Sequence, residues 1–494
     1  TVMLDDPIRA VQALPGVAAN NDYQSRFTVH GAGFEHIGLY LDDVLMHSPF
    51  HAISGEGDGS LAMVNGEMVS DMALLVNAPP VEYSDRTAGF LVVRTREGSR
   101  TKPSFRIAGG VAGSSALGEG PLAHGRGSWI VAARKSYVQY LLSRLSTDNA
   151  LALGFTDYQG KVAYALTDRQ NVSLFVLDGV TDLDRSSARS RSGVNALIGG
   201  RTRSTLVKAN WQDTVTPKLL LNVTGAFIRE RTSTSNKFDL PIEAGFYGEW
   251  TGAASAVYQF KGANAFQAGW DARRLRDDGA SLYYLNDQFH VRQQDAHRGT
   301  ALRQGGYAGE TWSALKGRIH GAVGVRWDGH ESYHTTPTSP QASAAFRLPL
   351  GPELQFGWGQ YVQFPELAQI TSPMGGARLA PERANHYSVA VEQRAGGDSR
   401  IRVEAWNRDD RDRISQPLLD PRLINNQVTL GTNVNYYNST RGYSRGVTVL
   451  AQRRSANRLS GWVSYTLGYA RERDSMAGAS YWSIHDQRHI ANVY

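Results

Sequence analysis

The stretch RFTVHGAGFEHIGLYLDDVLMHSPFH, residues 26–51, holds side chains that could do acid–base or metal chemistry. Asp42 and Asp43 are adjacent carboxylates, the groups that a general acid and a general base would use. His47 and His51 are spaced i,i+4, which suits a zinc site only on a helix, and a proline between them opposes a helix. Adjacent strand residues point to opposite faces, so the two carboxylates cannot enter one site without a bulge. We therefore expect Asp42 to have a structural role at the end of a hairpin, and we expect neither catalysis nor a metal site here.

The composition of the chain limits its functional class. Its 494 residues include 52 Lys and Arg against 46 Asp and Glu, and this small surplus argues against a nucleic-acid-binding protein. The count of 0 Cys excludes disulfides and thiolate metal sites. No apolar run reaches the roughly 18 to 20 residues of a transmembrane helix. The 51 Gly, 10 Trp, 22 Tyr and 16 Phe instead indicate a β-rich protein with many turns. We expect no cofactor.

Alternating segments dominate the chain from about Phe105 onward. Each covers roughly 8 to 12 residues, with apolar side chains on one face and small or polar ones on the other. In LLLNVTGAFI (219–228), for example, the apolar face opposes Asn222 and Thr224. The apolar faces repeatedly end in Tyr or Trp, as in a transmembrane β-barrel with aromatic girdles at both interfaces. An Arg or Lys facing lipid at mid-depth costs about 2 to 4 kcal/mol, so Lys161 and Arg326 should point into the lumen.

The connections between these segments fall into two classes. Short connections that read as tight turns occupy 167–170, 261–264 and 349–353, and longer polar ones occupy 181–202, 271–303, 364–383 and 408–441. Short turns at one rim and long loops at the other are typical of outer-membrane barrels. We count about 17 strands from Phe105 to Tyr494 on this pattern.

The first hundred residues follow a different pattern. Ile8, Val11 and Leu14 share one face of a short helix that should end at Pro15-Gly16. Brief strands with glycines between them follow at 27–29, 38–44, 72–76 and 90–95. We therefore predict a small α+β domain over residues 1–102 and a barrel domain over residues 103–494.

This order resembles that of TonB-dependent outer-membrane receptors, in which a plug domain precedes a barrel of about 22 strands. The resemblance covers the whole chain. In the plug it rests on LPGV, FTVHG, LYLDDV, SPFH and EYSDRTAGFLVVRTREG, which contain Leu14, Pro15, Gly16, Gly31, Asp42, Asp43 and Arg94. In the barrel it rests on GSWIVAARKSY, LAPERANHYSVAVEQ and IHDQRHIANVY. His30 and Asp43 depart from the family pattern, where Arg and Gly are commoner.

The resemblance implies active transport across the outer membrane and no enzymatic activity. A scarce extracellular ligand would bind the outer loops and plug tips, and the TonB complex of the inner membrane would act on the plug. It also implies contacts of the barrel with outer-membrane lipid and lipopolysaccharide, contacts of Asp42 with the plug hairpin or the barrel wall, and no nucleic-acid partner. A surface lipoprotein stays open as a further partner. The candidates for ligand contact are Arg134, Lys161, Tyr283, Tyr284, Arg326, Glu392, Tyr436 and Tyr437.

Two other interpretations stay open. A passive porin or an adhesion barrel would lack the plug that residues 1–98 indicate. A soluble, β-rich, glycan-active enzyme would need two carboxylates about 5 to 9.5 Å apart and polar outward faces, which the Tyr- and Trp-ended apolar faces oppose. An incomplete barrel would leave unpaired backbone groups in hydrocarbon, so we expect the natural chain to continue before Thr1 and beyond Tyr494.

Overall fold

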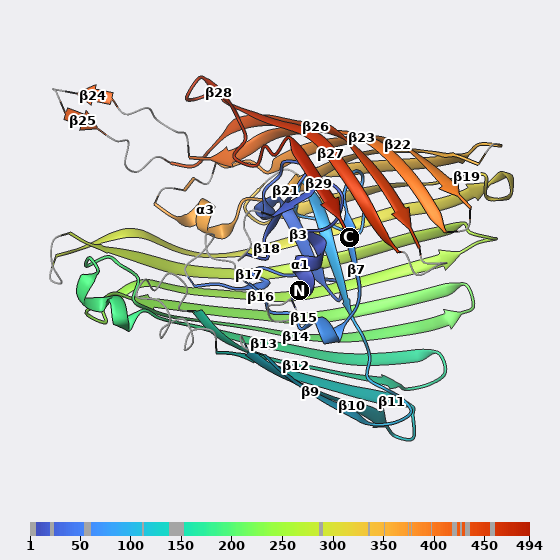
Figure 1. Cartoon of the computed structure of the whole chain (residues 1–494), viewed down its shortest axis with the longest axis horizontal. Helices are drawn as coiled ribbons and strands as arrows, with labels where there is room; N and C mark the ends of the chain where they lie inside the picture. Colours follow the sequence, from blue (N-terminus) through green and yellow to red (C-terminus); the bar gives the residue numbers. More distant parts are fainter. Residues whose placement is uncertain are drawn as a thin grey trace.

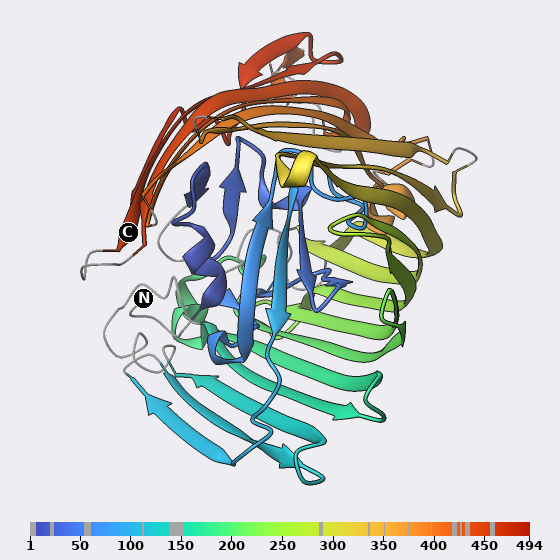
Figure 2. The ribbon, with the colours of Figure 1, turned by 90° about the vertical axis from the view of Figure 1, so that its right-hand side faces the viewer.

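A large antiparallel sheet curls around a small domain in the computed structural model (Figures 1 and 2). The structure describes residues 6–19, 24–53, 61–110, 113–137, 153–285, 290–333, 336–349, 351–373, 375–376, 378–396, 398–416, 422–424, 427–429, 435–454 and 460–494. Figure 2 shows the small domain, in blue, inside the curve of the sheet. Because it fills the lumen, we call the region formed by residues 6–95 the plug.

The barrel sheet has 19 strands in the described ranges. They are β9 (Ser104–Gly109), β10 (Gly113–Leu122), β11 (Gly127–Ser136), β12 (Leu153–Ala165), β13 (Gln170–Asp184), β14 (Gly199–Thr216), β15 (Leu219–Ser235), β16 (Pro241–Gln259), β17 (Ala265–Tyr284), β18 (Val291–Ala314), β19 (Ile319–His330), β20 (Thr338–Arg347), β21 (Glu353–Gln363), β22 (Glu382–Ala395), β23 (Ser399–Ser415), β26 (Tyr437–Arg453), β27 (Gly461–Asp474), β28 (Ala479–Trp482) and β29 (His489–Val493). A separate hairpin is formed by β24 (Arg422–Ile424) and β25 (Gln427–Thr429).

The count exceeds the expected 17 in part because the last two strands share one neighbour. β28 pairs with residues 471–474 of β27, and β29 pairs with residues 463–467 of the same strand. β28 and β29 therefore lie end to end along β27, and on the sequence pattern we had expected only one strand there.

The two faces of the barrel strands differ as the alternation predicts. On the outer face Val223 and Trp250 are exposed, whereas Lys161 and Arg326 point into the lumen and contact buried groups. Short turns lie at one rim and longer connections at the other (Figure 1). The prediction of a loop over 271–303 is wrong, because β17 continues to Tyr284 and β18 starts at Val291. Charged side chains there alternate along strands and pair with each other, as Arg276 does with Asp278 at 2.6 Å.

The plug is a small α+β unit, as the sequence predicts. Its elements are α1 (Pro7–Val11), β1 (Val17–Ala19), β2 (Phe27–Val29), the 3-10 helix η1 (Phe34–His36), β3 (Ile37–Leu41), β4 (Val44–Leu45), β5 (Phe50–His51), β6 (Leu61–Ala62), the 3-10 helix η3 (Gly66–Met68), β7 (Val69–Leu75) and β8 (Gly89–Thr95). Four strands form a sheet in the order β4-β3-β8-β7, in which β3 and β8 are parallel. Parallel strands buried on both faces carry continuous apolar runs, and β3 and most of β8 are indeed buried.

Helices are few and short. The side chain of Asp6 caps α1 by accepting a hydrogen bond from the Ile8 amide at 2.9 Å, and Pro7 suits the first helical position. Three more helical turns lie at the barrel rims: η4 (Ser186–Arg191), η5 (Leu315–Gly317) and α3 (Leu367–Thr371). No helix in the described ranges is both long and apolar enough to cross a bilayer.

Candidate functional site

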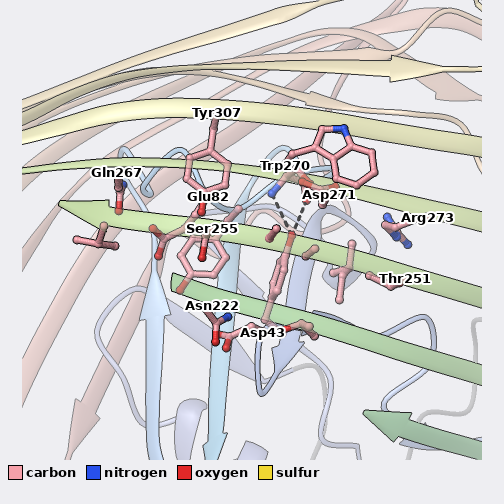
Figure 3. Close-up of a pocket in the computed structure, with 18 residues that line it drawn as sticks. Asp43, Glu82, Asn222, Thr251, Ser255, Gln267, Trp270, Asp271, Arg273 and Tyr307 are labelled. Carbon is pink, nitrogen blue, oxygen red and sulfur yellow. Dashed lines mark hydrogen bonds between the residues drawn. The ribbon is translucent and has the colours of Figure 1, made fainter. Parts of the chain in front are cut away.

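A cavity of about 230 Å³ lies between the plug and the barrel wall (Figure 3). The plug contributes the β3–β4 hairpin and the segment 82–84, and the wall contributes β15, β16, β17 and β18. Its polar lining consists of Tyr40, Asp43, Glu82, Tyr83, Ser84, Asn222, Thr224, Thr251, Ser255, Gln267, Asp271, Arg273 and Tyr307. Most of the wall residues come from the parts of β16 and β17 next to the turn at 260–264, so the cavity is on the turn side of the lumen.

Two carboxylates of the plug give this cavity an acidic side. Glu82 and Asp43 both line it (Figure 3). Burial, together with the negative charge of Asp43, raises the pKa of Glu82 above its ordinary value. The Tyr40 hydroxyl accepts a hydrogen bond from the Ser84 amide at 3.1 Å and thereby holds this segment against β3. The cavity is therefore polar, with its shape fixed by both the plug and the wall.

Asp85 connects the plug to the wall beside the cavity. Its Oδ2 accepts hydrogen bonds from Nη1 of Arg273 at 2.9 Å and Nη1 of Arg303 at 2.6 Å, and its Oδ1 accepts one from the Phe364 amide at 3.0 Å. Glu249 holds Arg273 from the wall, with contacts of 2.8 and 3.0 Å. Burial opposes the charged form of Asp85, but the neighbouring arginine charges outweigh it and lower the pKa of this carboxyl. Four charged groups are thus shared between the plug and three barrel strands.

Asp42 makes a second connection to the wall. Its carboxylate accepts hydrogen bonds from the Thr95 amide at 2.7 Å, from the Thr95 hydroxyl at 2.5 Å and from Lys161 Nζ at 3.0 Å. Its carbonyl oxygen accepts one from Lys208. Asp43, which follows it, is 56 % exposed at its side chain, so the two carboxylates do not share one site. This is the hairpin end with wall contacts that the sequence predicts.

Arg134 and Arg326 are lumen-facing and held in ion pairs. Arg134 Nε donates to Asp157 Oδ2 at 2.8 Å, and its Nη2 donates to the Ala62 carbonyl at 2.6 Å. Arg326 lies 2.6 Å from Asp271 and 2.8 Å from Asp328. Both side chains are 2 % exposed, so in this arrangement they hold the wall and the plug in place and present no free charge to a solute.

The predicted aromatic contacts lie at the loop rim. Tyr283 is exposed, while Tyr284 is buried with its hydroxyl donating to the Pro241 carbonyl at 3.1 Å. Tyr437 is exposed at the start of β26, and Tyr436 precedes it. One tyrosine pair ends β17 and the other lies at the start of β26, and these two strands are not neighbours in the sheet.

Glu392 lies at the opposite end of the barrel. It is near the end of β22 beside the turn rim, with its carboxylate 3.6 to 3.9 Å from Arg394, Arg400 and Arg402. The eight residues predicted for ligand contact are therefore spread along the whole barrel and do not form one cluster.

Two glycines of the plug motif allow close packing, one within the plug and one against the wall. Gly16 has φ +74°, and a Cβ there would lie 2.6 Å from the ring of His30. Gly31 has φ +68°, and a Cβ there would lie 2.5 Å from that of Ala470 on β27. The His30 ring stacks on Trp406 with centroids 3.9 Å apart, and burial lowers its pKa to about 3. A neutral, stacked histidine thus occupies the position where the family resemblance leads us to expect an arginine.

The other motif residues have simpler surroundings. The Leu14 carbonyl accepts a hydrogen bond from Asn492 Nδ2 at 2.9 Å, and Pro15 follows in the turn that ends at Gly16. Arg94 is exposed on β8, where its carbonyl accepts a hydrogen bond from the Ser70 hydroxyl at 3.0 Å.

The two histidines with zinc-like spacing go to different partners. The His47 ring stacks on Tyr247 with centroids 3.7 Å apart and lies 3.6 Å from Glu230. Burial opposes its charge, but Glu230 outweighs burial and raises the pKa of His47 to about 9. His51 Nε2 instead lies 2.7 Å from Asp157. In the part of the chain that the structure describes, no three His, Asp or Glu side chains are grouped as metal ligands.

The sequence analysis missed residues that line the cavity or hold the plug beside it. Glu82, Tyr83 and Asp85 lie in EYSDRTAGF, which we used only as part of a family resemblance. Arg273 and Arg303 lie in the stretch interpreted as a loop. The available signal was weak: charged residues occupy most of 271–278, and Leu275 lies on the same face as the arginine at 273.

Comparisons with known proteins agree with this architecture. The family model for the β-barrel of TonB-dependent receptor-like proteins matches residues 106–493. Among curated proteins, none matches the sequence. Among solved structures, the siderophore receptor PirA from Pseudomonas aeruginosa is similar, with a TM-score of 0.70, 14 % identity and coverage of 95 % of this chain and 83 % of that chain. The FrpB iron transporter from Neisseria meningitidis gives a TM-score of 0.72 at 11 % identity, covering 96 % of this chain and 78 % of that one.

A third similar structure is the alcaligin outer-membrane receptor FauA from Bordetella pertussis. Its TM-score is 0.68 at 14 % identity, with 98 % of this chain and 80 % of that chain covered. At these identities the structural likeness concerns the fold, and the family model carries the assignment. A plug inside a barrel whose sequence matches that model over most of its length identifies the chain as a member of the TonB-dependent receptor family of outer-membrane β-barrel proteins.

Proposed function

We propose that this chain is an active importer, which binds a scarce extracellular ligand at the loop rim and passes it through the barrel with energy that TonB delivers to the plug. The observation that carries the proposal is the interface between plug and wall. It is built from buried charges and hydrogen bonds around Asp85 and Asp42, and it encloses a polar cavity. A passive pore needs an open lumen, whereas this one is filled.

The small size of the cavity supports a plug that moves during transport. Pockets that bury a whole small ligand have volumes of roughly 300 to 1,000 Å³. The cavity of about 230 Å³ falls below this range. The contacts of Asp85 with Arg273, Arg303 and the Phe364 amide join the cavity wall to the segment before α3. A ligand entering from the loop rim would reach the cavity only after such contacts separate.

Metal complexes are the first ligands to test. The similar structures are named as a siderophore receptor, an iron transporter and a copper transporter. Initial contact would involve Tyr283, Tyr284, Tyr436 and Tyr437 at the rim. Arg134, Lys161, Arg326 and Glu392 would meet the ligand later, once the plug has moved.

A reversible tether between plug and wall tests the proposal. A Cβ at Gly357 on β21 would lie 3.1 Å from the Cβ of Ala78 in the plug. The Cβ atoms of disulfides are roughly 3.5 to 4.5 Å apart, so a small outward shift would allow a bridge here. The chain has 0 Cys, so Ala78→Cys with Gly357→Cys introduces a single possible bridge. In cells with the natural full-length protein, oxidation should stop uptake of radioactive ferric siderophores or copper complexes, and a reductant should restore it.

The single variants Ala78→Cys and Gly357→Cys are the controls, and both should transport under oxidising conditions. Uptake through the oxidised tether would contradict a moving plug. A readout independent of the ligand is the conductance of the purified protein in planar bilayers. A steady ion current without TonB would indicate a passive pore instead of an importer.

A further inference from the structure

One connection of the plug lies across the barrel wall without joining any sheet. Residues 77–85, between β7 and β8, belong to no helix or strand, and we call them the strap. The strap runs over the lumen face of the wall from β23 to β17, because its first residue contacts Glu404 and its last contacts Arg273 and Arg303. A segment outside the hydrogen-bonded ladders can leave the wall without breaking a sheet.

Both ends of the strap have strained backbone. Asn77, Ala78 and Asp85 have φ of +57°, +78° and +61°, in the left-handed region that residues with a Cβ disfavour. Polar contacts hold each end in place. Asn77 Nδ2 donates to Glu404 Oε1 at 2.9 Å, and the Asp85 carboxylate accepts hydrogen bonds from the two arginines. The closed position therefore depends on contacts at the two ends, and opening would release the strain.

The middle of the strap covers a polar side chain of the wall. Val81 packs so closely on β19 that a Cβ at Gly324 would lie 2.7 Å from its Cγ1, and on β21 the Tyr361 hydroxyl donates to the Pro79 carbonyl at 3.0 Å. Gln341 on β20 lies between these contacts, because it pairs with Gly324. Gln341 is 7 % exposed, and its amide group finds no hydrogen-bond partner among the described residues. Since buried polar groups are nearly always paired, this amide suits a surface that is covered only part of the time.

The end of the strap separates two spaces in the lumen. The cavity of about 230 Å³, on the turn side, is lined by Glu82, Tyr83 and Ser84 of the strap (Figure 3). The contacts of Asp85 close it toward Phe364 and α3, on the loop side. Movement of the strap off the wall would therefore join the cavity to the lumen on the loop side.

The β5–β6 hairpin of the plug is held differently. Its two strands are hydrogen-bonded to each other, and neither contains a residue with positive φ. The Ala62 carbonyl accepts a hydrogen bond from Arg134 Nη2 at 2.6 Å, and His51 Nε2 lies 2.7 Å from Asp157. This part of the plug combines regular backbone with buried wall contacts, whereas the strap combines strained backbone with contacts at its ends.

We propose that the strap is a gate in the plug: residues 77–85 leave the wall while the four-stranded sheet and the β5–β6 hairpin stay attached. When the gate opens, Gln341 and the cavity become parts of one polar passage. This inference rests on the proposed importer function, since a gate has a use only where a solute passes. The gate confines the movement to one connection of the plug, so the rest of the plug need not unfold.

Thiol labelling of the purified full-length protein tests the gate without ligand or TonB. The chain has 0 Cys, so Gln341→Cys introduces one thiol beneath the strap. A maleimide should modify this thiol slowly, because the thiol is reached only when the strap opens. Adding Asp85→Asn should raise the rate about a hundredfold or more, since two buried arginines lose their shared carboxylate. Intact-mass spectrometry follows the reaction, and Asp239→Asn, which removes an exposed partner of Arg189, should leave the rate unchanged.

Two thiols behind other parts of the plug show whether the gate moves alone. Ser204 on β14 is 3 % exposed and lies next to the contact of Met63 with β13. Ser464 on β27 is 2 % exposed and lies next to β29, which binds the Leu14 carbonyl. Ser204→Cys and Ser464→Cys should react slowly both with and without Asp85→Asn.

Ala78→Gly tests the strap in the opposite direction and leaves the ion pairs in place. Gly adopts the φ of this position freely, so relief of strain should stabilise the closed strap. The labelling rate of Gln341→Cys should fall roughly twofold or more, although the greater freedom of Gly in the open strap offsets part of the gain. This variant also serves if Asp85→Asn does not fold, which heat-dependent gel migration of the barrel would report.

Three results would overturn the gate. Equal acceleration of all three thiols by Asp85→Asn would show that the plug loosens as one body, which leaves the importer proposal intact. An unchanged rate at Gln341→Cys would show that the Asp85 contacts do not hold the strap. Faster labelling in Ala78→Gly would show that the closed strap is not strained. Failure of the importer proposal is seen separately, as uptake through the oxidised tether between positions 78 and 357.

Discussion

Asp85 and Asp42 bring carboxylates from the plug, while Arg273, Arg303 and Lys161 bring the cations from the barrel wall. Asp85 and the two arginines around it are nearly buried. Such pairs add little stability compared with apolar packing, but removing one partner leaves the other charges uncompensated. The arrangement therefore holds the plug strongly only while every partner is in place, which suits a contact that must be broken and made again.

Replacing Asp85 by Asn should destabilise the plug by about 3 to 5 kcal/mol, because two buried arginines would lose their shared carboxylate. The pKa of Asp85 is held below its ordinary value of 3.8. Its stabilising effect should therefore be complete above about pH 3.8 and be lost as the pH falls further through the lower folded value. Hydrogen exchange of plug amides measures the change. Asp239→Asn removes an exposed partner of Arg189 and should leave exchange unaltered, whereas unaltered exchange in Asp85→Asn would contradict the argument.

The sequence predicted on which face of the sheet such side chains lie, but it did not predict which residues they contact. Alternation along β12 and β19 predicted that Lys161 and Arg326 face the lumen, because the cost of facing lipid is large. Lys161 is 119 residues from Asp42, and Arg303 is 218 residues from Asp85. No local pattern encodes contacts at such separations, so these pairings became visible only in the folded chain.

At the scale of elements, the backbone of the β3–β4 hairpin suits the Gly that the family resemblance leads us to expect at position 43. Asp42 and Asp43 form its two-residue turn with φ of +47° and +66°. Hairpin turns of this kind need a positive φ at both central residues, which Asp tolerates at some cost and Gly adopts freely. Asp43 contributes only a half-exposed contact with Lys208 at 3.8 Å.

Asp43→Gly should therefore leave the plug as stable or more stable by up to about 1 kcal/mol, since relief of the turn strain exceeds the loss of a weak ion pair. Asp43→Val should destabilise the plug, because a β-branched side chain resists positive φ. The midpoint of chemical denaturation of the plug, measured for both variants and the wild type, tests these two expectations. If Asp43→Gly destabilised the plug and Asp43→Val did not, the argument from turn strain would be wrong. The contact with Lys208 would then explain the Asp at this position.

Strand ends were the least predictable elements. Beyond the membrane the outer face of β17 changes from Trp270 to Arg274, Arg276 and Asp278, and a polar run of this composition resembles a loop. Ion pairs line the outer face of this part of the strand: Arg276 with Asp278 two residues along β17, and Arg274 with Glu331 after β19. The sequence therefore indicated the membrane-spanning parts of the strands better than their outer halves.

On the scale of the whole molecule, the barrel is much taller than the membrane is thick. β17 has 20 residues and β18 has 24, while about 9 to 11 tilted residues cross the apolar band. Trp250, which is 65 % exposed on the outer face and would belong to the aromatic girdle on the loop side, pairs with Arg274 of β17. The part of this hairpin beyond Arg274 consequently projects from the membrane on the loop side and carries Tyr283 and Tyr284.

Shortening this hairpin should separate barrel assembly from ligand capture. Asp278 and Arg298 are partners in the register, so an Asn-Gly turn can replace residues 279–297 without shifting the strands. The shortened protein keeps its apolar band and the contacts of Arg273 and Arg303 with the plug, so it should still insert, as heat-dependent gel migration of the folded barrel would show. Ligand uptake should fall sharply, because the rim residues that make first contact are gone. Tyr283→Ala is the milder control and should lower uptake less. If the shortened barrel transports as well as the wild type, first contact lies in other loops; if it fails to insert, the outer halves of the strands are needed for assembly itself.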